Sequence, residues 1–226
     1  MTGMGGAPTT GGMTVDIWSD VVCPWCYIGK RRLEKALDGF THADSVLVRW
    51  RSFELDPHAP PERTGDPAER IAAKYGMTTE QARRGQERLA MLAAAEGLTY
   101  RLAEARSGST FDAHRLIHLA AAHDLSDAAE ERFMAAYLCD AQAIGRPEVL
   151  ERLAVEIGLP PSEVNAVLTG DEYGAEVRKD EAEAAARGIT AVPTFVVDGR
   201  FTIPGAQDPE TIMAILERAW TRREAA

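Results

Sequence analysis

Two cysteines separated by two residues, Cys23 and Cys26, are the part of this sequence best suited to covalent chemistry. Residues three apart on a helix have neighbouring Cβ atoms, a separation within the range that a disulfide can bridge. The pair could therefore open and close as a redox switch with little movement of the backbone. Cys139 is the third cysteine of the 226-residue chain, and it has no partner nearby in the sequence.

Pro24 indicates where the helix that carries the pair begins. Proline is favoured at the first helical position, which makes Cys23 the N-cap. The Cys23 sulfur would then face unpaired backbone N–H groups and the positive end of the helix dipole. Both stabilise the thiolate, which is the attacking species in disulfide exchange. We therefore expect Cys23 to be the nucleophile, and the more covered Cys26 to stay a thiol until it resolves the mixed disulfide.

A CxxC pair also occurs by coincidence or as half of a zinc site. A structural zinc site uses four ligands, usually supplied by a second CxxC or a pair of histidines. This chain has no second CxxC, and its five histidines are scattered. His114 and His118 have helical spacing but no third ligand beside them. We expect no metal site.

Apolar segments on both sides of the cysteines predict the elements that hold them. Residues 14–18 (TVDIW) and 46–50 (VLVRW) are typical of β-strands, and the residues from Tyr27 to Phe40 keep helical spacing. The sequence therefore opens with a strand–helix–strand unit.

The end of the chain predicts a hairpin followed by a helix. Residues 194–197 (TFVV) and 200–203 (RFTI) flank Asp198–Gly199, a dipeptide typical of two-residue hairpin turns. Asp208 and Pro209 then fit the N-cap and first position of a last helix.

Roughly 140 residues between these ends have almost no strand signal, far more than an ordinary crossover needs. Glycine and proline divide this region into helical segments at 79–96, 112–123, 127–138, 147–158, after 160–161 and at 171–187. We predict an α/β protein in which a helical domain, residues 61–170, is inserted into a small mixed-sheet domain made of 13–60 and 171–223.

Charge and composition exclude some classes of function. The chain has 25 Lys and Arg against 35 Asp and Glu, a net charge of −10, and no dense basic run, so we expect no nucleic-acid partner. No segment approaches the length of a membrane span. Residues 1–12 have neither the basic nor the apolar part of a secretory signal, and we expect a disordered tail and a cytoplasmic protein, unless a signal has been removed.

Four ordered segments resemble the DsbA-like thioredoxin-fold oxidoreductases, and most closely their FrnE-like branch. The first is residues 19–29 (SDVVCPWCYIG), with the CPWC motif followed by Tyr, an aliphatic residue and Gly. The others are 51–55 (RSFEL), 109–115 (STFDAHR) and 188–195 (GITAVPTF) followed by 205–207 (GAQ). The resemblance extends over residues 14–220.

This resemblance implies a thioredoxin-like fold with an inserted all-helical domain and an active-site motif that includes Pro24 and Trp25. It also implies a cis peptide bond between Val192 and Pro193, beside the cysteines. The backbone N–H and C=O of Val192 could then pair with an extended substrate chain as an added strand, while Pro193 keeps competing ligands from Cys23. No cofactor is implied, although glutathione could be a co-substrate.

Three further residues are candidates for contact with substrate. Ser109 stands where the family has Asn, which puts the specificity of a small-molecule pocket in this chain in doubt. His114 could touch substrate in the cleft between the domains or pack inside a helix, and the sequence favours neither. Trp25 would belong to the docking surface, or else pack on the helical domain. Cys139 fits a half-buried apolar position better than a third redox thiol.

The sequence therefore predicts a thiol–disulfide oxidoreductase or isomerase that acts on disulfide- or thiol-containing proteins or on glutathione. One alternative is a glutathione-dependent isomerase of small aromatic carboxylic acids, although the related isomerases typically have Ser in place of the first Cys. Another is a chaperone-like module that binds extended chains. The physiological substrate, the direction of the redox reaction and the oligomeric state stay open.

Overall fold

A four-stranded mixed sheet lies at the centre of the protein. The computed structural model describes residues 12–224, so the predicted tail lies outside the described residues except for Gly12. The strand order is β2-β1-β3-β4, with β1 parallel to β2 and antiparallel to β3, and β3 antiparallel to β4. The strands are β1 Met13–Ser19, β2 Val46–Ser52, β3 Thr194–Val197 and β4 Phe201–Pro204.

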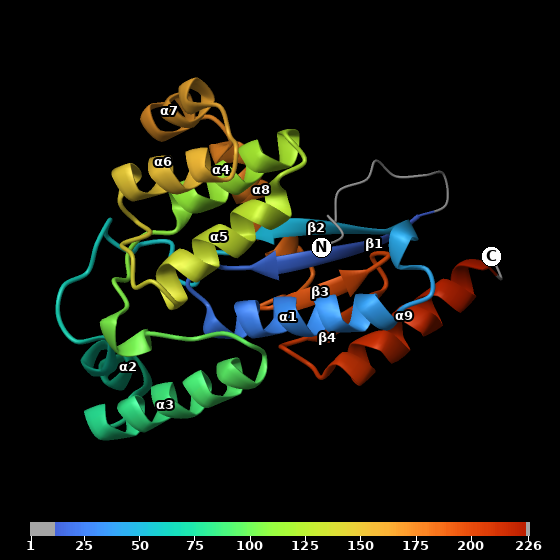
Figure 1. Cartoon of the computed structure of the whole chain (residues 1–226), viewed down its shortest axis with the longest axis horizontal. Helices are drawn as coiled ribbons and strands as arrows, with labels where there is room; N and C mark the ends of the chain where they lie inside the picture. The colour runs from blue at the N-terminus through green and yellow to red at the C-terminus, as the bar shows by residue number, and fades with distance from the viewer. Residues whose placement is uncertain (1–11, 225–226) are drawn as a thin grey trace.

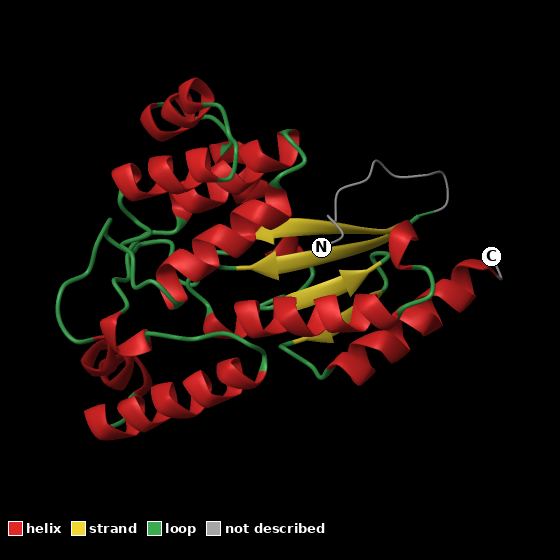
Figure 2. Ribbon diagram, viewed as in Figure 1, coloured by secondary structure: helices red, strands yellow, loops and turns green. Residues whose placement is uncertain are grey.

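Helices cover both faces of the sheet (Figures 1 and 2). They are α1 Pro24–Gly39, α2 Pro67–Tyr75, α3 Thr79–Ala95, α4 Phe111–Ala122, α5 Ser126–Leu138, α6 Pro147–Glu156, α7 Pro161–Thr169, α8 Gly174–Ala186 and α9 Pro209–Glu224. Helices α1 and α9 lie side by side along one face (Figure 1). In the described part of the chain, no helix combines the length and the apolar character needed to cross a membrane.

Alternation along β1 explains why the sheet is covered on both faces. Side chains of successive residues in a strand point to opposite faces. Val15 and Ile17 belong to the main core with α1 and α9, whereas Trp18 packs with Ala184 of α8 in a smaller cluster. The indole N–H of Trp18 also donates to the carbonyl oxygen of Asp180 at 2.9 Å. Helix α8 is thereby fixed to the face opposite α1.

The two ends of the sequence fold as predicted. The strand–helix–strand unit is β1–α1–β2, and its strands are parallel as such a crossover requires. Asp198 and Gly199 both have positive φ, 49° and 68°, as the predicted hairpin turn requires, but the connection is one residue longer than predicted, because β4 begins at Phe201 and pairs it with Val197. The last helix begins at Pro209.

The central region is helical, and it contains one helix that the sequence analysis missed. Asp66 caps α2 by accepting a hydrogen bond from the backbone N–H of Ala68 at 2.8 Å, and Pro67 occupies the first turn. Gly76 ends this helix in the left-handed conformation, with φ of 66°. Helices α2 and α3 lie apart from α4–α7 in Figure 1, and α8 packs on both β2 and α4. The division into two domains stays a prediction.

Candidate active site

Cys23 is the N-cap of α1, as the sequence analysis predicted. Its backbone is extended (φ −85°, ψ 113°), and Pro24 follows at the start of the helix. The Cys23 N–H donates to the carbonyl oxygen of Asp20 at 2.9 Å, which closes the turn between β1 and α1. The first turn of α1 contains no acidic side chain. The Cys23 sulfur therefore lies at the positive end of a helix, without an opposing charge on that turn.

The two cysteines, both free thiols, differ in their access to solvent. Both are largely buried, with Cys23 5% and Cys26 1% exposed, but Cys23 lines a cavity of about 830 Å³ whereas Cys26 does not. Burial, together with a hydrogen bond and the negative charge of Cys23, raises the pKa of the Cys26 thiol well above its ordinary value. Cys26 therefore stays protonated while Cys23 is the sulfur that a substrate meets.

The segment Val192–Pro193 borders the cysteines, and its peptide bond is cis. The Cys23 thiol donates to the carbonyl oxygen of Val192 at 3.6 Å. Pro193 lies so close to α1 that a Cβ on Gly29 would be 3.0 Å from the Pro193 ring. Gly29 thus allows the proline loop to approach the active-site helix, and Val192 brings a backbone acceptor to the reactive sulfur.

The cavity beside Cys23 is lined by residues from several separate segments. Trp25 is 42% exposed and forms part of the wall. Leu55 follows β2, and Tyr75 and Met77 stand at the end of α2. Thr190, Ala191 and Val192, which precede the cis-proline, also line the cavity. This arrangement leaves an open, largely apolar site in front of one sulfur.

Tyr100 supports the start of α1, a role that sequence reasoning missed. Its hydroxyl donates to the carbonyl oxygen of Pro24 at 2.7 Å, and its ring stacks on Tyr27 at a centroid distance of 6.4 Å. Burial raises the pKa of the Tyr100 hydroxyl, so it remains a donor. The sequence shows only a tyrosine between two helices, and nothing in its spacing connects it to Pro24.

His114 lies in the interior, only 1% exposed, and does not line the cavity. Its Nε2 is 3.5 Å from Oδ1 of Asp20. Burial lowers the pKa of His114, but the nearby carboxylate of Asp20 outweighs it, and the pKa is raised. This geometry offers His114 no direct contact with a substrate.

Ser109 also lies beside the cavity rather than in its wall. Gly108 and Thr110 line the cavity, while the Ser109 hydroxyl accepts a hydrogen bond from the backbone N–H of Phe111 at 3.3 Å. The Ser109 N–H donates to the carbonyl oxygen of Pro60 at 2.8 Å. The structure therefore brings together Cys23, Pro24, Trp25 and Val192 at the cavity, and places Ser109 and His114 outside it.

Asp20 and Glu130 are buried acids near this site that the sequence analysis did not single out. Both oxygens of Asp20 are engaged, with the backbone N–H of Val22 at 3.4 Å and that of Leu55 at 2.8 Å. Burial raises the pKa of Glu130 to about 8, and its Oε2 has no hydrogen-bond partner. Among residues 12–224, no group of three or more His, Cys, Asp or Glu side chains is arranged to hold a metal ion.

Comparisons with known proteins find similar chains over most of the sequence. The sequence profile of the DSBA-like thioredoxin domain matches residues 14–217. A probable DsbA oxidoreductase from Streptomyces coelicolor is 46% identical, with a TM-score of 0.89 over 92% of this chain and 90% of that one. The uncharacterized protein YwbO of Bacillus subtilis (strain 168) is 29% identical over 194 residues, which cover 85% of this chain and 90% of YwbO.

A more distant likeness extends the comparison of the fold. The cytosolic disulfide reductase DsbM from Pseudomonas aeruginosa, solved with GSH, is 20% identical and has a TM-score of 0.61. The match covers 91% of this chain and 98% of DsbM. The similarity therefore includes both the sheet and the helical region.

Proposed function

This chain belongs to the DSBA-like thioredoxin domain family, and we propose that it is a thiol–disulfide oxidoreductase that works through Cys23 and Cys26. The observation that carries the proposal is the division between the two sulfurs. Cys23 caps a helix and lines a cavity, whereas Cys26 is buried one turn behind it. Disulfide exchange needs one accessible thiolate and one covered resolving thiol.

In the reducing direction, the Cys23 thiolate attacks one sulfur of a substrate disulfide. A Cys23–substrate disulfide forms, the substrate S–S bond breaks, and the departing thiolate takes a proton from solvent. Cys26 then loses its proton and attacks the Cys23 sulfur. This step releases the second substrate thiolate and leaves the Cys23–Cys26 disulfide, so that the substrate gains two electrons and the protein loses two.

In the oxidising direction the same steps run in reverse, and the reduction potential of the pair decides which direction prevails. Proposed partners are proteins with thiols or disulfides, and glutathione as a co-substrate that restores the pair. The DsbM structure, solved with GSH, supports a glutathione partner, and its description as cytosolic supports our proposal of a cytoplasmic location. We propose no bound cofactor.

The segment at Val192–Pro193 supports the binding of an extended chain. The Val192 carbonyl lies 3.6 Å from the Cys23 sulfur, so a substrate strand paired with this backbone would bring its own cysteine to Cys23. We propose that Val192 binds the substrate main chain and that Pro193 shields the sulfur. Ser109 and His114 would support the neighbouring walls without touching the substrate.

Equilibration with glutathione redox buffers tests the proposed function. The protein is incubated over a series of reduced-to-oxidised glutathione ratios, thiols are trapped with a mass tag, and the Cys23–Cys26 disulfide is quantified by mass spectrometry. We expect a two-electron transition, because one disulfide forms per protein molecule.

The variant Cys139→Ser is the matched control and should show the same transition, whereas Cys26→Ser should form only a mixed disulfide with glutathione. Absence of any transition over the whole series would contradict the proposal. Glutathione-dependent isomerisation of an aromatic carboxylic acid that survives Cys26→Ser would favour the isomerase instead.

A further inference from the structure

Four large apolar side chains are exposed to solvent at the cavity beside Cys23. Trp25 is 42% exposed, Leu55 39%, Tyr75 64% and Met77 38%, and all four line this cavity. They come from three separate segments of the chain, the start of α1, the residues after β2 and the end of α2, so their convergence depends on the fold. Grouped apolar exposure of this kind is typical of a binding surface.

The same cavity has three cations that, among the described residues, form no ion-pair contact with a carboxylate. Arg70 and Lys74 on α2 and Arg88 on α3 line it. Arg70 donates only to the backbone oxygens of Thr64 and Gly65. Within residues 12–224, none of the three cations forms an ion pair with an acidic side chain. This is unexpected in a chain whose net charge is −10.

The acidic residues of the cavity offset these cations only in part, since the pKa of Asp56 is lowered mainly by its hydrogen bond to Arg63 and only to a smaller extent by the charge of Lys74. Asp56 forms an ion pair with Arg63, the fourth cation of the lining. Asp20 is buried and accepts hydrogen bonds from the backbone N–H groups of Val22 and Leu55. The surface that a ligand would meet is therefore apolar with an excess of positive charge.

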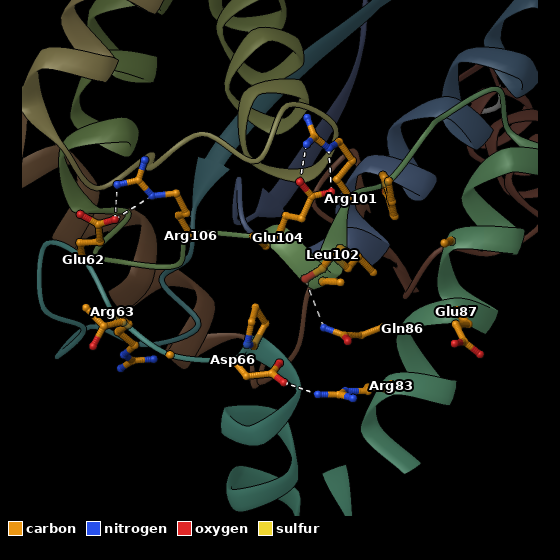
Figure 3. A pocket seen from close by; sticks show the side chains of 17 residues that line it. Glu62, Arg63, Asp66, Arg83, Gln86, Glu87, Arg101, Leu102, Glu104 and Arg106 are labelled. Atoms are coloured by element: carbon orange, nitrogen blue, oxygen red, sulfur yellow. Dashed lines mark hydrogen bonds and ion pairs between the residues drawn. The ribbon is translucent and has the colours of Figure 1, made fainter. Parts of the chain in front are cut away.

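A neighbouring cavity of about 980 Å³, between α2, α3 and the loop at 101–106, shows the opposite arrangement (Figure 3). Gln86, which lines both cavities, donates to the carbonyl oxygen of Leu102 at 3.3 Å. Three arginines of this second cavity face carboxylates, in the pairs Glu62–Arg106, Asp66–Arg83 and Glu104–Arg101. Ion pairing within the protein is thus available in this region, whereas Arg70, Lys74 and Arg88 of the cavity beside Cys23 form no ion pair within the described residues.

We infer that the cavity beside Cys23 binds an extended, cysteine-bearing polypeptide segment that has both apolar and acidic side chains. The inference rests on the proposed function, because the cysteine of the segment must reach Cys23. The carboxylates would pair with Arg70, Lys74 and Arg88, and the apolar side chains would cover the exposed wall. Glutathione is too small and too hydrophilic to cover that wall. Residues 1–11 of this chain do not fit the cavity either, because they contain no acidic side chain to pair with its cations.

Two matched peptides test this inference. Each has one cysteine, held in a mixed disulfide with a chromogenic aryl thiol, and the same apolar residues, but one has Glu and the other Gln on both sides. The second-order rate constant of the reduced protein is measured from release of the chromophore. We expect a preference of about fivefold for the Glu peptide at low ionic strength, the size expected of a few exposed ion pairs, and a smaller one in high salt.

The variant that removes the unpaired cations should lose this preference, because its rate on the Glu peptide falls towards its rate on the Gln peptide. The changes are Arg70→Gln, Lys74→Gln and Arg88→Gln. Arg88→Gln alone, at an exposed position, should lose part of the preference if the triple variant folds poorly.

The matched control removes the same amount of charge from the neighbouring cavity and should keep the preference. The changes are Arg83→Gln, Arg101→Gln and Arg106→Gln. Equal rates of the wild type on both peptides, or an equal loss in the control, would overturn the inference but leave the proposed function standing. No reaction with either peptide would instead overturn the proposed function.

Oxidised glutathione is the small-molecule arm of the same experiment. We expect the triple variant to lose its peptide preference without a comparable loss of rate on glutathione. The reverse result, a fivefold loss on glutathione with peptide preference unchanged, would overturn the polypeptide occupant in favour of a small anionic disulfide.

Discussion

Charged groups on the two sides of the dithiol have different surroundings. On the cavity side, Lys74 and Arg88 are exposed and form no ion pair within the part of the chain that the structure describes. On the interior side, Lys30 and Glu130 are buried among other ionisable groups. Exposed unpaired cations cost the fold little and remain available to a ligand, whereas buried charges are coupled to the stability of the fold. Charge on the cavity side is therefore available for binding a ligand, whereas charge on the interior side contributes to the stability of the fold.

We expect the largest effect from replacement of the two cysteines. Cys23→Ser should lower the rate of disulfide reduction by about 1000-fold or more, because the nucleophile is removed. Cys26→Ser should also stop turnover, but after the first step, so that a Cys23–substrate disulfide accumulates. Quenched reactions analysed by non-reducing electrophoresis and mass spectrometry distinguish the two. Accumulation of a mixed disulfide on Cys26 in the Cys23→Ser variant would reverse the assigned roles.

Replacement of Lys30 tests whether the buried charges on the interior side stabilise the fold. Its ammonium lies 3.2 Å from Asp127 and 3.1 Å from Glu131, both on α5, and it also pairs with Glu34. Lys30→Met removes the buried partner of these partly exposed carboxylates and should lower the free energy of unfolding by about 1–3 kcal/mol, measured in urea. The cavity-side control Arg88→Gln should change it by less than about 0.5 kcal/mol. Similar losses in both variants would break the comparison.

The raised pKa of Glu130 leads us to predict how the free energy of unfolding depends on pH. Its pKa is raised from 4.5 to about 8 in the folded protein by burial, so between these values the folded state holds a proton that the unfolded state has lost. The free energy of unfolding must therefore fall as pH rises through this window. In Glu130→Gln this contribution vanishes, and the variant should gain on the wild type by about 1.4 kcal/mol per pH unit.

Urea unfolding between pH 5 and 8.5 measures this gain. A residual decline should remain in Glu130→Gln, because the raised pKa of His114 also makes stability fall as pH rises through its folded value. Exposed Glu87→Gln is the matched control and should leave the pH dependence of the wild type unchanged. Parallel curves for wild type and Glu130→Gln would refute the prediction.

Tyr100 gives the smallest expected effect. Tyr100→Phe removes the hydroxyl that donates to the Pro24 carbonyl at 2.7 Å but keeps the stacked ring, and should lower the free energy of unfolding by about 1 kcal/mol. Exposed Tyr75→Phe, which changes the same group in the cavity wall, should have no measurable effect on unfolding. A larger loss in the Tyr75 variant would mean that the cavity wall contributes to stability.

The sequence was sufficient to predict the thioredoxin-like α/β fold and the position of the cysteine pair in it. The α/β class and the position of the pair follow from local rules, since strand alternation, Asp198–Gly199 and the proline after Cys23 act through neighbours in the chain, whereas the thioredoxin-like fold was implied by the resemblance to the DsbA-like family. Helix α2 could have been found in the same way, because Asp66–Pro67 is the same start signal that identified Asp208–Pro209. The assignment to the FrnE-like branch stays a prediction.

The surroundings of the site could not be predicted in this way. The cavity wall combines residues from near position 20 to position 192, and their meeting depends on tertiary packing. A lone His114 on a helix has no signal that distinguishes a buried residue from one facing a cleft. A glutamate is usually found at the surface, and Glu130 is buried here by tertiary packing, in which α5 lies against α4.

The hydrogen bonds of Asp20 hold the reactive cysteine independently of the cavity wall on α2 and α3. The reactive sulfur is held by peptide groups, since the Cys23 N–H bonds to the Asp20 carbonyl while the Asp20 carboxylate fixes the N–H groups of Val22 and Leu55. Side chains on α2 and α3 take no part in this turn. Mutations there could alter which molecules are accepted without disturbing the nucleophile, so diversification of substrate range and retention of the reaction could proceed independently among descendants of this protein.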